Sequence, residues 1–599
     1  MGSAAPGTTV IRGGSLHDGT GAPARPADVV LRDGVVAEVL PPGAPAPSGD
    51  VVDAAGCWVT PGFVDLHTHY DAEVEVSPGL TESVRHGITT VLMGSCGLSM
   101  AVGEPEDLAD MFCRVEGIPR TEVLPLLERI VTWTTPGEYL DHLASLPLGP
   151  NVTTMLGHST IRAHVMGLDR ALADDVDPSR DELLAMGRLL RAACEDGFLG
   201  LSINTLPWDK MDGPRFRSLP TPSVYASWDE YRFFTRILRR YGAILQGVPN
   251  VSTKVNLLRF IAESAGLGRR DPLRTMIISL ADLRFDRTVA PTVGALARLC
   301  NTVLGGDLRL QSLPVPFDMF VDGLEVPVIE EFGAGTTALS RLDPDDRAGL
   351  LRQPEFRERF RREWTAWLPG RAYHRDLDEA RVLDCPDAAV VGRSFGEIAR
   401  ERDEDPVDTF LDLQAEHGEK LRWYTVVAND RIERLRWIMD HPDVLIGFSD
   451  AGAHLRNMAF YNFPLRMLKR VREAEQAGEA FMTPERAVHR CTQELAEYLG
   501  IAGGVVAPGA PADVVVLDPV ALDGPAVEDV HEAPMEGFGL RRYVRRNDDV
   551  VRATFVNGHA LWRDGAATAS LGTEQAGRLR RPVDRPLGAS AAAAARARG

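Results

Sequence analysis

Long apolar runs, positive charge and paired cysteines are all scarce in this sequence of 599 residues. No run reaches the ~18 apolar residues that a membrane span requires, so we expect no membrane partner. The formal charge is −20, and an acidic surface repels nucleic acid, which we therefore do not expect as a partner. The seven cysteines are odd in number, scattered and never spaced as CxxC, which disfavours a disulfide framework. The first residues, MGSAAPGTTVIRGG, lack the basic start and apolar core of a secretory signal. These absences predict a cytoplasmic protein.

Both ends of the chain are rich in short β-type segments separated by glycine turns. Such segments fill residues 8–57 and return at 511–519 and 550–565, where Asn557-Gly558 is typical of a hairpin turn. We therefore expect a small β-sandwich domain built from both termini, residues 1–57 and 506–570. The low-complexity segment 571–599 is predicted to be disordered.

Between these ends, residues 58–505 alternate apolar runs with segments of helical periodicity, such as 182–197 and 230–242. The apolar runs lie at 62–70, 89–97, 151–159, 198–204, 242–248, 274–282, 308–313 and 444–450. This alternation indicates the α/β class, and eight units favour a closed (β/α)8 TIM-like barrel over an open doubly wound sheet. The stretch of about 315–440 is too long for a simple connection. Because it contains charged helical segments, we interpret it as a helical insertion over the barrel mouth.

Two histidines, His67 and His69, end the first predicted barrel strand. Residues i and i+2 of a strand point the same way, so both imidazoles are expected at the mouth where barrel enzymes hold their sites. Imidazole pairs suit zinc and similar divalent metals. An HxH pair alone is a weak motif, but its place at the end of an apolar strand strengthens it.

Asp450 and Cys96 end the eighth and second predicted strands and face the same mouth. A carboxylate there can bind metal and accept a proton from water, although it could also be a turn or N-cap aspartate. A thiolate is a strong zinc ligand, although most single cysteines are simply buried apolar residues.

Further candidates surround these residues. His158, at the end of the third strand, is a candidate acid or base. His454, four residues after Asp450, is a candidate for substrate binding, as are Arg456, whose guanidinium could pair with a carboxylate, and Asn204 at the end of the fourth strand. Each could equally be a packing, capping or solvated residue.

Several short motifs occur in a characteristic order. They are PGFVDLHTHYDA, MGSCG, GHSTIRAHVMG, FLGLS, GFSDAGAH and GGVVAPGAPADVVVLDP. Together they resemble the N-acyl-D-amino-acid deacylase (D-aminoacylase) branch of the amidohydrolase superfamily. The likeness covers most of residues 8–565 and is weakest over 205–440.

The resemblance implies a metal-dependent hydrolase of carbon–nitrogen bonds other than peptide bonds. It implies that a divalent metal is bound by His67, His69, Cys96 and Asp450, with Asp450 as general base toward metal-activated water. Hydrolysis of a linear amide would release a carboxylic acid and an amine. The sequence does not identify the acyl group, the amine or its stereochemistry.

The sequence departs from that branch at the fifth and sixth strands, where the relatives place metal-binding histidines. No histidine occurs between His164 and His374, and Lys210 and Lys254 lie beyond their strands. The chain could keep one metal, recruit other ligands such as His158, Asn250 or Asp282, or have lost metal. We favour one ion, zinc, because four ligands suffice for its coordination.

Two other functions remain open. The fold could catalyse a non-hydrolytic cyclisation, isomerisation or lyase step with a reduced metal site, since a fold does not fix a function. A non-enzymatic binding protein is the third reading, which the retained ligand set disfavours. The expected partner is a small-molecule substrate, and assembly into a homo-oligomer stays open.

Overall fold

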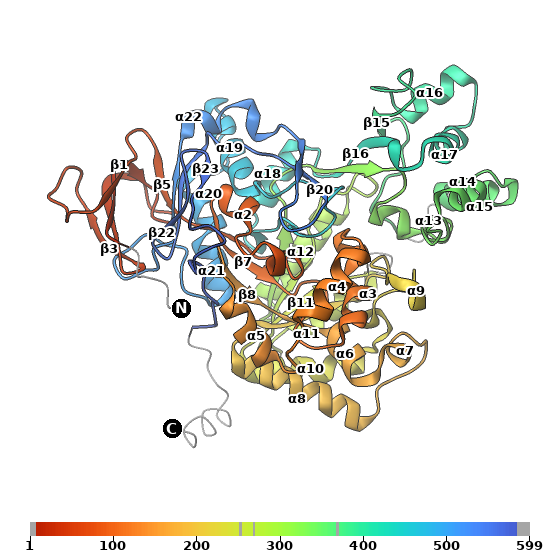
Figure 1. Cartoon of the computed structure of the whole chain (residues 1–599), viewed down its shortest axis with the longest axis horizontal. Coiled ribbons are helices and arrows are strands. Elements are labelled where there is room, and N and C mark those ends of the chain that lie inside the picture. Colours follow the sequence, from red (N-terminus) through yellow and green to blue (C-terminus); the bar gives the residue numbers. More distant parts are fainter. Residues whose placement is uncertain (1–6, 251–253, 268–269, 367–369, 584–599) are drawn as a thin grey trace.

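A computed structural model of the chain describes residues 7–250, 254–267, 270–366 and 370–583. Two all-parallel sheets occupy its middle, ordered β6-β7-β8 and β9-β10-β11-β12-β13-β17 (Figure 1). Their strands are β6 (Phe63–Asp65), β7 (Ile88–Met93), β8 (Asn151–Thr154), β9 (Leu156–Gly157), β10 (Gly200–Asn204), β11 (Ile244–Val248), β12 (Arg274–Ile277), β13 (Asp307–Ser312) and β17 (Val444–Ile446). Each of the eight predicted apolar runs overlaps one of these strands, or two in the case of 151–159.

Backbone contacts join the edges of the two sheets. Only Met155 separates β8 from β9 along the chain. At the opposite edges, the amide of Leu66 donates to Gly447 at 2.7 Å and that of Asp450 donates to His67 at 3.1 Å. The first and last strands therefore lie side by side, with the residues that follow them in contact.

The space among these strands is filled with apolar side chains. Val64, Leu92, Ile244, Met276 and Leu445 belong to one buried cluster, to which each contributes from a different strand. The last α-helix before the C-terminal strands, Gln493–Leu499, adds its leucines to the same cluster. The centre is thus a packed core, which leaves the carboxyl ends of the strands to carry the site.

Helices alternate with these strands, as the 3.6-residue periodicity predicts. A capping box of Ser179 and Glu182 starts the helix Arg180–Asp196, and Gly197 ends it in the left-handed region at φ 115°. The helices are α1 (Glu73–Val76), α2 (Thr81–Arg85), α3 (Pro105–Glu116), α4 (Arg120–Ile130), α5 (Pro136–Ser145), α6 (His158–Met166), α7 (Leu168–Ala171), α8 (Arg180–Asp196), α9 (Gly213–Phe216), η1 (Pro222–Tyr225), α10 (Trp228–Tyr241), α11 (Lys254–Ser264), α12 (Val289–Thr302), α18 (Ile432–Asp440), α19 (Phe463–Gln476), α20 (Pro484–Cys491), α21 (Gln493–Leu499), α22 (Pro519–Leu522) and η4 (Pro525–Val527). No helix among the described residues has both the length and the apolar character needed to cross a membrane.

Both ends of the chain build a single sheet of nine strands, in the order β23-β22-β21-β18-β5-β1-β2-β3 with β4 paired to β1. The strands are β1 (Thr9–Leu16), β2 (Arg25–Arg32), β3 (Val35–Leu40), β4 (Asp50–Asp53), β5 (Trp58–Pro61), β18 (Val514–Leu517), β21 (Val551–Val556), β22 (His559–Arg563) and β23 (Ala566–Ala567). The expected joining of the two termini is therefore present, whereas a sandwich of two sheets stays a prediction.

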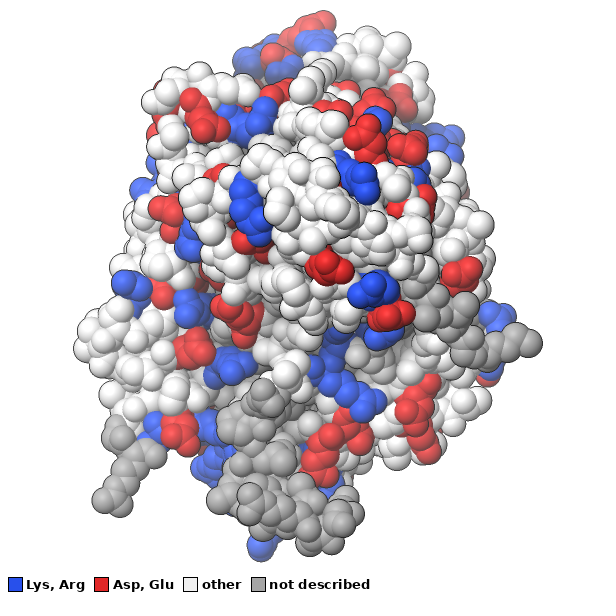
Figure 2. Space-filling view, turned by 90° about the vertical axis from the view of Figure 1, so that its left-hand side faces the viewer, with Lys and Arg blue, Asp and Glu red and all other residues white. Residues whose placement is uncertain are grey.

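On the face that Figure 2 shows, acidic and basic side chains are interspersed.

The insertion differs from the predicted helical one. It holds an antiparallel sheet in the order β14-β16-β15, together with helices and its own hydrophobic cluster, and in Figure 1 it forms a lobe beside the parallel strands. Its elements are β14 (Phe317–Asp322), η2 (Pro327–Glu331), α13 (Gly333–Leu339), α14 (Pro344–Leu351), α15 (Pro354–Thr365), β15 (Arg381–Asp384), α16 (Phe395–Arg402), α17 (Pro406–His417), η3 (Gly418–Lys420) and β16 (Arg422–Ala428). The aromatic and β-branched residues of β14 and β16 suit strands. A short hairpin, β19 (His531–Pro534) with β20 (Arg541–Val544), completes the fold.

The prediction of a disordered tail is wrong for residues 571–583. The amide of Gly577 donates to Leu148 at 2.7 Å, that of Arg580 donates to Val152 at 2.8 Å, and that of Val152 donates to Arg578 at 3.0 Å. The low complexity of the sequence was a poor guide to order in this segment, because backbone hydrogen bonds to the edge of a sheet do not depend on the variety of side chains. The remainder of the predicted tail, 584–599, lies outside the described residues.

Candidate metal centre

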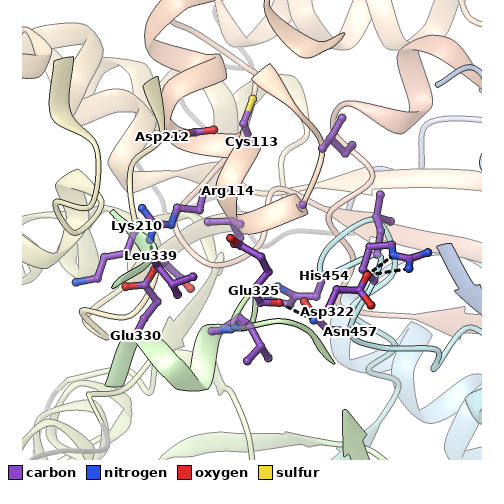
Figure 3. A pocket seen from close by; sticks show the side chains of 18 of the residues that line it. Cys113, Arg114, Lys210, Asp212, Asp322, Glu325, Glu330, Leu339, His454 and Asn457 are labelled. Atoms are coloured by element: carbon purple, nitrogen blue, oxygen red, sulfur yellow. Dashed lines mark hydrogen bonds and ion pairs between the residues drawn. The ribbon is translucent and has the colours of Figure 1, made fainter. Parts of the chain in front are cut away.

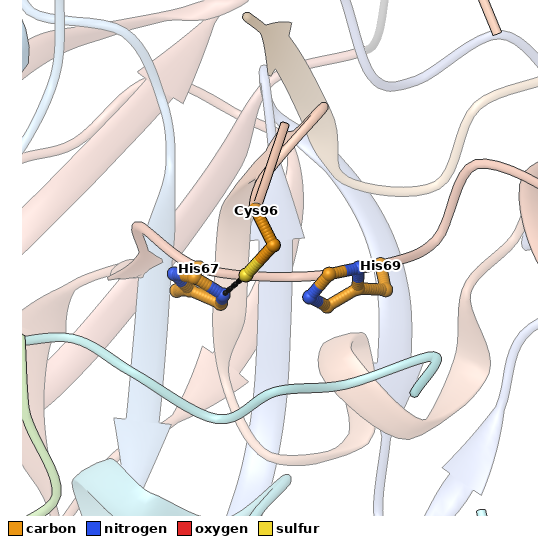
Figure 4. Close-up of side chains that lie close together, drawn as sticks. All are labelled: His67, His69 and Cys96. Atoms are coloured by element: carbon orange, nitrogen blue, oxygen red, sulfur yellow. Dashed lines mark hydrogen bonds between the residues drawn. The ribbon is translucent and has the colours of Figure 1, made fainter. Parts of the chain in front are cut away.

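His67, His69 and Cys96 meet at the carboxyl ends of the first two parallel strands. One ligand atom of each lies within 4.8 Å of the other two, and all three residues are buried. The Cys96 Sγ is 3.4 Å from His67 Nε2, and Figure 4 shows the thiol between the two imidazole rings. Among the residues that the structure describes, this is the single cluster of three such groups at this spacing.

Asp450 closes the group from the end of β17. Its Oδ1 lies 3.3 Å from His69 Nε2 and 3.6 Å from His67 Nε2. Asp450 and Cys96 both adopt left-handed backbone, at φ 58° and 55°, which is uncommon for residues with a side chain. Such strain concentrates where a fold must aim a functional group, and here both residues follow strand ends.

Two glutamines that the sequence analysis missed support the cluster. Gln311 on β13 accepts a 2.9 Å hydrogen bond from His67 Nδ1 when that nitrogen carries the proton, which leaves Nε2 free for a metal. Gln246 on β11, a strand where the resembled branch has a metal-binding histidine, accepts from the amide of Cys96 at 3.0 Å. Each glutamine interrupts an apolar strand, which was the available signal.

Burial and neighbouring charges shift the pKa values of this group in different directions, and against the effect of burial the pKa of His69 is raised by the hydrogen bond and charge of Asp450. Burial lowers the pKa of His67 to about 3 and raises the pKa of the Cys96 thiol well above its usual value. Burial would also raise the pKa of Asp450, but the hydrogen bond and charge of His69, with His454 and His67, hold it well below its ordinary value. Two imidazoles, a thiol and a carboxylate form a donor set that fits one divalent ion such as zinc.

A cavity of about 410 Å³ adjoins the cluster. His454, whose Nε2 is 3.9 Å from Asp450 Oδ2, is part of its wall, and Figure 3 shows it with neighbouring wall residues. The wall combines the end of α3, the loop after β10, the insertion around η2 and the loop after β17. The insertion therefore contributes to the wall of the space beside this cluster.

The structure engages His158 and Asp282, two further candidates, with partners outside the cluster. His158 pairs its Nε2 with Glu230 at 2.9 Å and its Nδ1 with Ser223 at 3.1 Å, so both ring nitrogens are engaged away from Asp450. These contacts give His158 a packing position, and its catalytic role stays an unsupported prediction. Of the alternative ligands, Asp282 is held by Arg431 at 2.6 and 2.8 Å.

Two of the three predicted substrate-binding residues, Arg456 and Asn204, are already paired with other side chains, whereas the third, His454, is part of the cavity wall. Arg456 lines the cavity, but its guanidinium pairs with Asp322 at 2.8 Å and with Glu532 at 3.3 Å. Asn204 donates through its amide nitrogen to Asp209, a cavity residue that the sequence analysis missed. Asn204 therefore positions another wall residue, and the signal for Asp209 was only a carboxylate in a loop after a strand.

The chain is similar to several known proteins. A model of the amidohydrolase family matches residues 50–215. An uncharacterized protein of Mycobacterium tuberculosis is 48% identical over 562 residues, 93% of this chain and 92% of the relative. N-acyl-D-aspartate deacylase of Alcaligenes xylosoxydans xylosoxydans is 26% identical, with 96% of this chain and 95% of the relative covered. A crystal structure of D-aminoacylase has a TM-score of 0.61 at 25% identity and covers 96% of this chain and 99% of its own.

Proposed function

Because the chain belongs to the amidohydrolase family, whose members of this kind hydrolyse carbon–nitrogen bonds other than peptide bonds, we propose that it cleaves a linear amide in an N-acyl amino acid. The D-configured acids are the nearest candidates, since the named relatives act on them. The observation that carries the proposal is the convergence of His67, His69, Cys96 and Asp450 beside a cavity.

Within this proposal, each residue of the cluster has a role. His67, His69, Cys96 and Asp450 hold one divalent metal, most simply zinc. When bound, such an ion supplies Lewis acidity toward the amide carbonyl and toward water. Asp450 takes the proton of the attacking water and passes it to the departing nitrogen, so that amide plus water gives a carboxylic acid plus an amine.

The glutamines support one metal ion rather than two. Gln246 and Gln311 stand in strands that surround the cluster, and their oxygens already accept hydrogen bonds from Cys96 and His67. A second ion would need further nitrogen, sulfur or carboxylate ligands, and no second close group occurs among the described residues. Because ligands for a second ion are absent from the described residues, a non-hydrolytic reaction on this fold is the alternative function.

We also infer the finer architecture that suits this chemistry. The hydrogen bonds between the residues after β6 and β17 support closure of the eight parallel strands into a (β/α)8 barrel, whose mouth carries the site. A cytoplasmic location and a homo-oligomeric state remain predictions.

The proposal is tested by metal content and by turnover. Mass spectrometry on protein purified without chelator or added metal should find about one zinc or similar ion per chain. The protein should then hydrolyse at least one compound in a panel of N-acyl-D- and N-acyl-L-amino acids. The rate of hydrolysis is measured as the rate at which free amine appears. Protein that stays free of metal after incubation with zinc would exclude the proposed chemistry and favour the non-hydrolytic alternative.

Asp450→Asn tests the role of Asp450 as general base, because it keeps the size of the side chain and removes its basic carboxylate. It should lower kcat by about 10²–10⁴-fold, since general base catalysis contributes this much, and leave the unfolding midpoint close to that of the parent. Asp229→Asn, on the exposed side of α10, is the control and should keep full activity. An active Asp450→Asn enzyme would remove Asp450 from the role of base.

A further inference from the structure

Lys210 lies in the loop that follows β10 and forms part of the cavity wall. Only 9% of its surface is exposed. Among the described residues, no hydrogen-bond acceptor or carboxylate oxygen lies within pairing distance of its ammonium, the limit being 4.0 Å for an ion pair. A nearly buried cation therefore opens onto the cavity without a partner.

The other cations of this wall are all paired. Arg114 is bound by Glu330 and donates to Ser218 at 2.8 Å, and Arg217 is bound by Asp212. Arg456 pairs with Asp322, as described above. Lys210 is thus the exception in a wall where the remaining positive charges are neutralised by the protein itself.

Burial of an unpaired charge is unfavourable and therefore favours the neutral form of the lysine. Burial lowers the pKa of Lys210, even though Glu330 favours the charged form. Glu330 is already engaged by Arg114, and Asp209 by Asn204. An oxyanion from a ligand would supply the missing partner and a charge-assisted hydrogen bond.

The position of Lys210 relates it to the metal centre. Asp209, its neighbour in sequence, shares the cavity wall with His454, and His454 approaches Asp450. In Figure 3, Lys210 and His454 lie on different sides of the pocket. A ligand that spans the pocket would place one end near the metal ligands and the other at Lys210.

We propose that Lys210 binds the carboxylate on the amino-acid half of the substrate and thereby makes the enzyme selective for amides that carry this acidic group. This inference rests on the proposed hydrolysis, whose amino-acid half would provide such a group. Lys210 replaces Arg456, the sequence-based candidate, because the guanidinium of Arg456 is already neutralised.

The kinetic test compares Lys210→Met, which removes the charge at similar length, with Lys210→Arg, which keeps it. Each is assayed on the best N-acyl amino acid and on its carboxamide, which lacks the charge. Lys210→Met should lower kcat/KM for the acid by about 10–100-fold and for the carboxamide by less than about twofold, with partial recovery in Lys210→Arg. Lys420→Met, an exposed lysine outside this cavity, is the control. Equal losses for acid and carboxamide, or no loss, would overturn the proposal.

A binding experiment keeps this test independent of turnover. Calorimetry would measure N-acetyl-D-leucine and N-acetyl-D-leucinamide with the parent chain and with Lys210→Met, each with zinc present. The acid should bind the parent more tightly than Lys210→Met by at least about tenfold, while the amide binds both equally. If no amide is hydrolysed, the proposed function fails. The difference in acid affinity between the parent and Lys210→Met still decides the role of Lys210. Absence of acid binding to the parent would overturn that role.

Discussion

Cys96 shows how much the chemistry of one residue depends on its surroundings. In the sequence it is one of seven scattered cysteines, and burial raises its thiol pKa, which would make it inert if it stood alone. Its position between His67 and His69 changes that expectation, because a metal stabilises the thiolate.

Cys96→Ser should weaken metal binding by at least the 10–100-fold that loss of a supporting partner around a metal typically costs, with about the same fold stability. The measurement is zinc retained after dialysis against graded chelator. Cys385→Ser, a buried cysteine of the insertion, should retain zinc like the parent. Unchanged retention in Cys96→Ser would return Cys96 to a packing role.

At the scale of elements, a buried ion-pair group attaches helix α2 to the C-terminal strands. Glu82 accepts hydrogen bonds of 2.9 Å from both Arg85 and Arg546 and is 1% exposed. Burial alone would raise the pKa of Glu82, but Arg542, Arg546 and Arg85 outweigh it and lower the pKa from 4.5 to about 2. The carboxylate thus contributes stability that is present above about pH 5 and is lost as the pH falls toward 2.

Glu82→Gln should destabilise the fold by about 3–5 kcal/mol at neutral pH, because it leaves buried arginines without their anion. The difference from the parent should shrink as the pH is lowered from 5 toward 2. Urea unfolding across this range measures both effects, with Glu122→Gln, an exposed residue of α4, as the control. A difference that does not change with pH would contradict the ion-pair explanation.

Elements also show where periodicity succeeds and where it is insufficient. The eight apolar runs predicted the parallel strands because strands buried on both faces are apolar throughout. The sequence predicts a helical insertion because residues 352–368 and 394–418 form charged helical segments. The strands β14 and β16 pair with each other although they lie about 100 residues apart in the chain. Local patterns do not specify such pairings.

At the scale of the whole molecule, residues 571–583 tie the end of the chain to both the central strands and the terminal sheet. Arg580 donates to Asp513 at 2.8 Å, and Asp513 also accepts from Asn151 at 3.0 Å and from the amide of Asn557 at 2.7 Å. Asp513 is buried, so its carboxylate oxygens need these hydrogen-bond donors.

Arg580→Gln should therefore cost about 1–3 kcal/mol of unfolding free energy, the penalty of leaving a buried acceptor poorly satisfied. The adjacent Arg581→Gln is the control and should change stability by less than about 0.5 kcal/mol, since it removes no ion pair described in the structure. Chemical denaturation midpoints provide the comparison. Equal midpoints for the two variants would mean that this end of the chain does not stabilise the fold.

The sequence by itself determined the class of fold, the joining of the two ends and the four metal-ligand candidates. It could do so because His67, Cys96 and Asp450 each lie at or near the carboxyl end of an apolar run, and parallel strands bring their carboxyl ends together. Only the tertiary structure decided that Gln246 and Gln311 support the cluster, that His158 and Arg456 are engaged elsewhere, and that Lys210 has no protein partner. These outcomes depend on which distant segments meet and on which charges they bury, and no local pattern of residues encodes either.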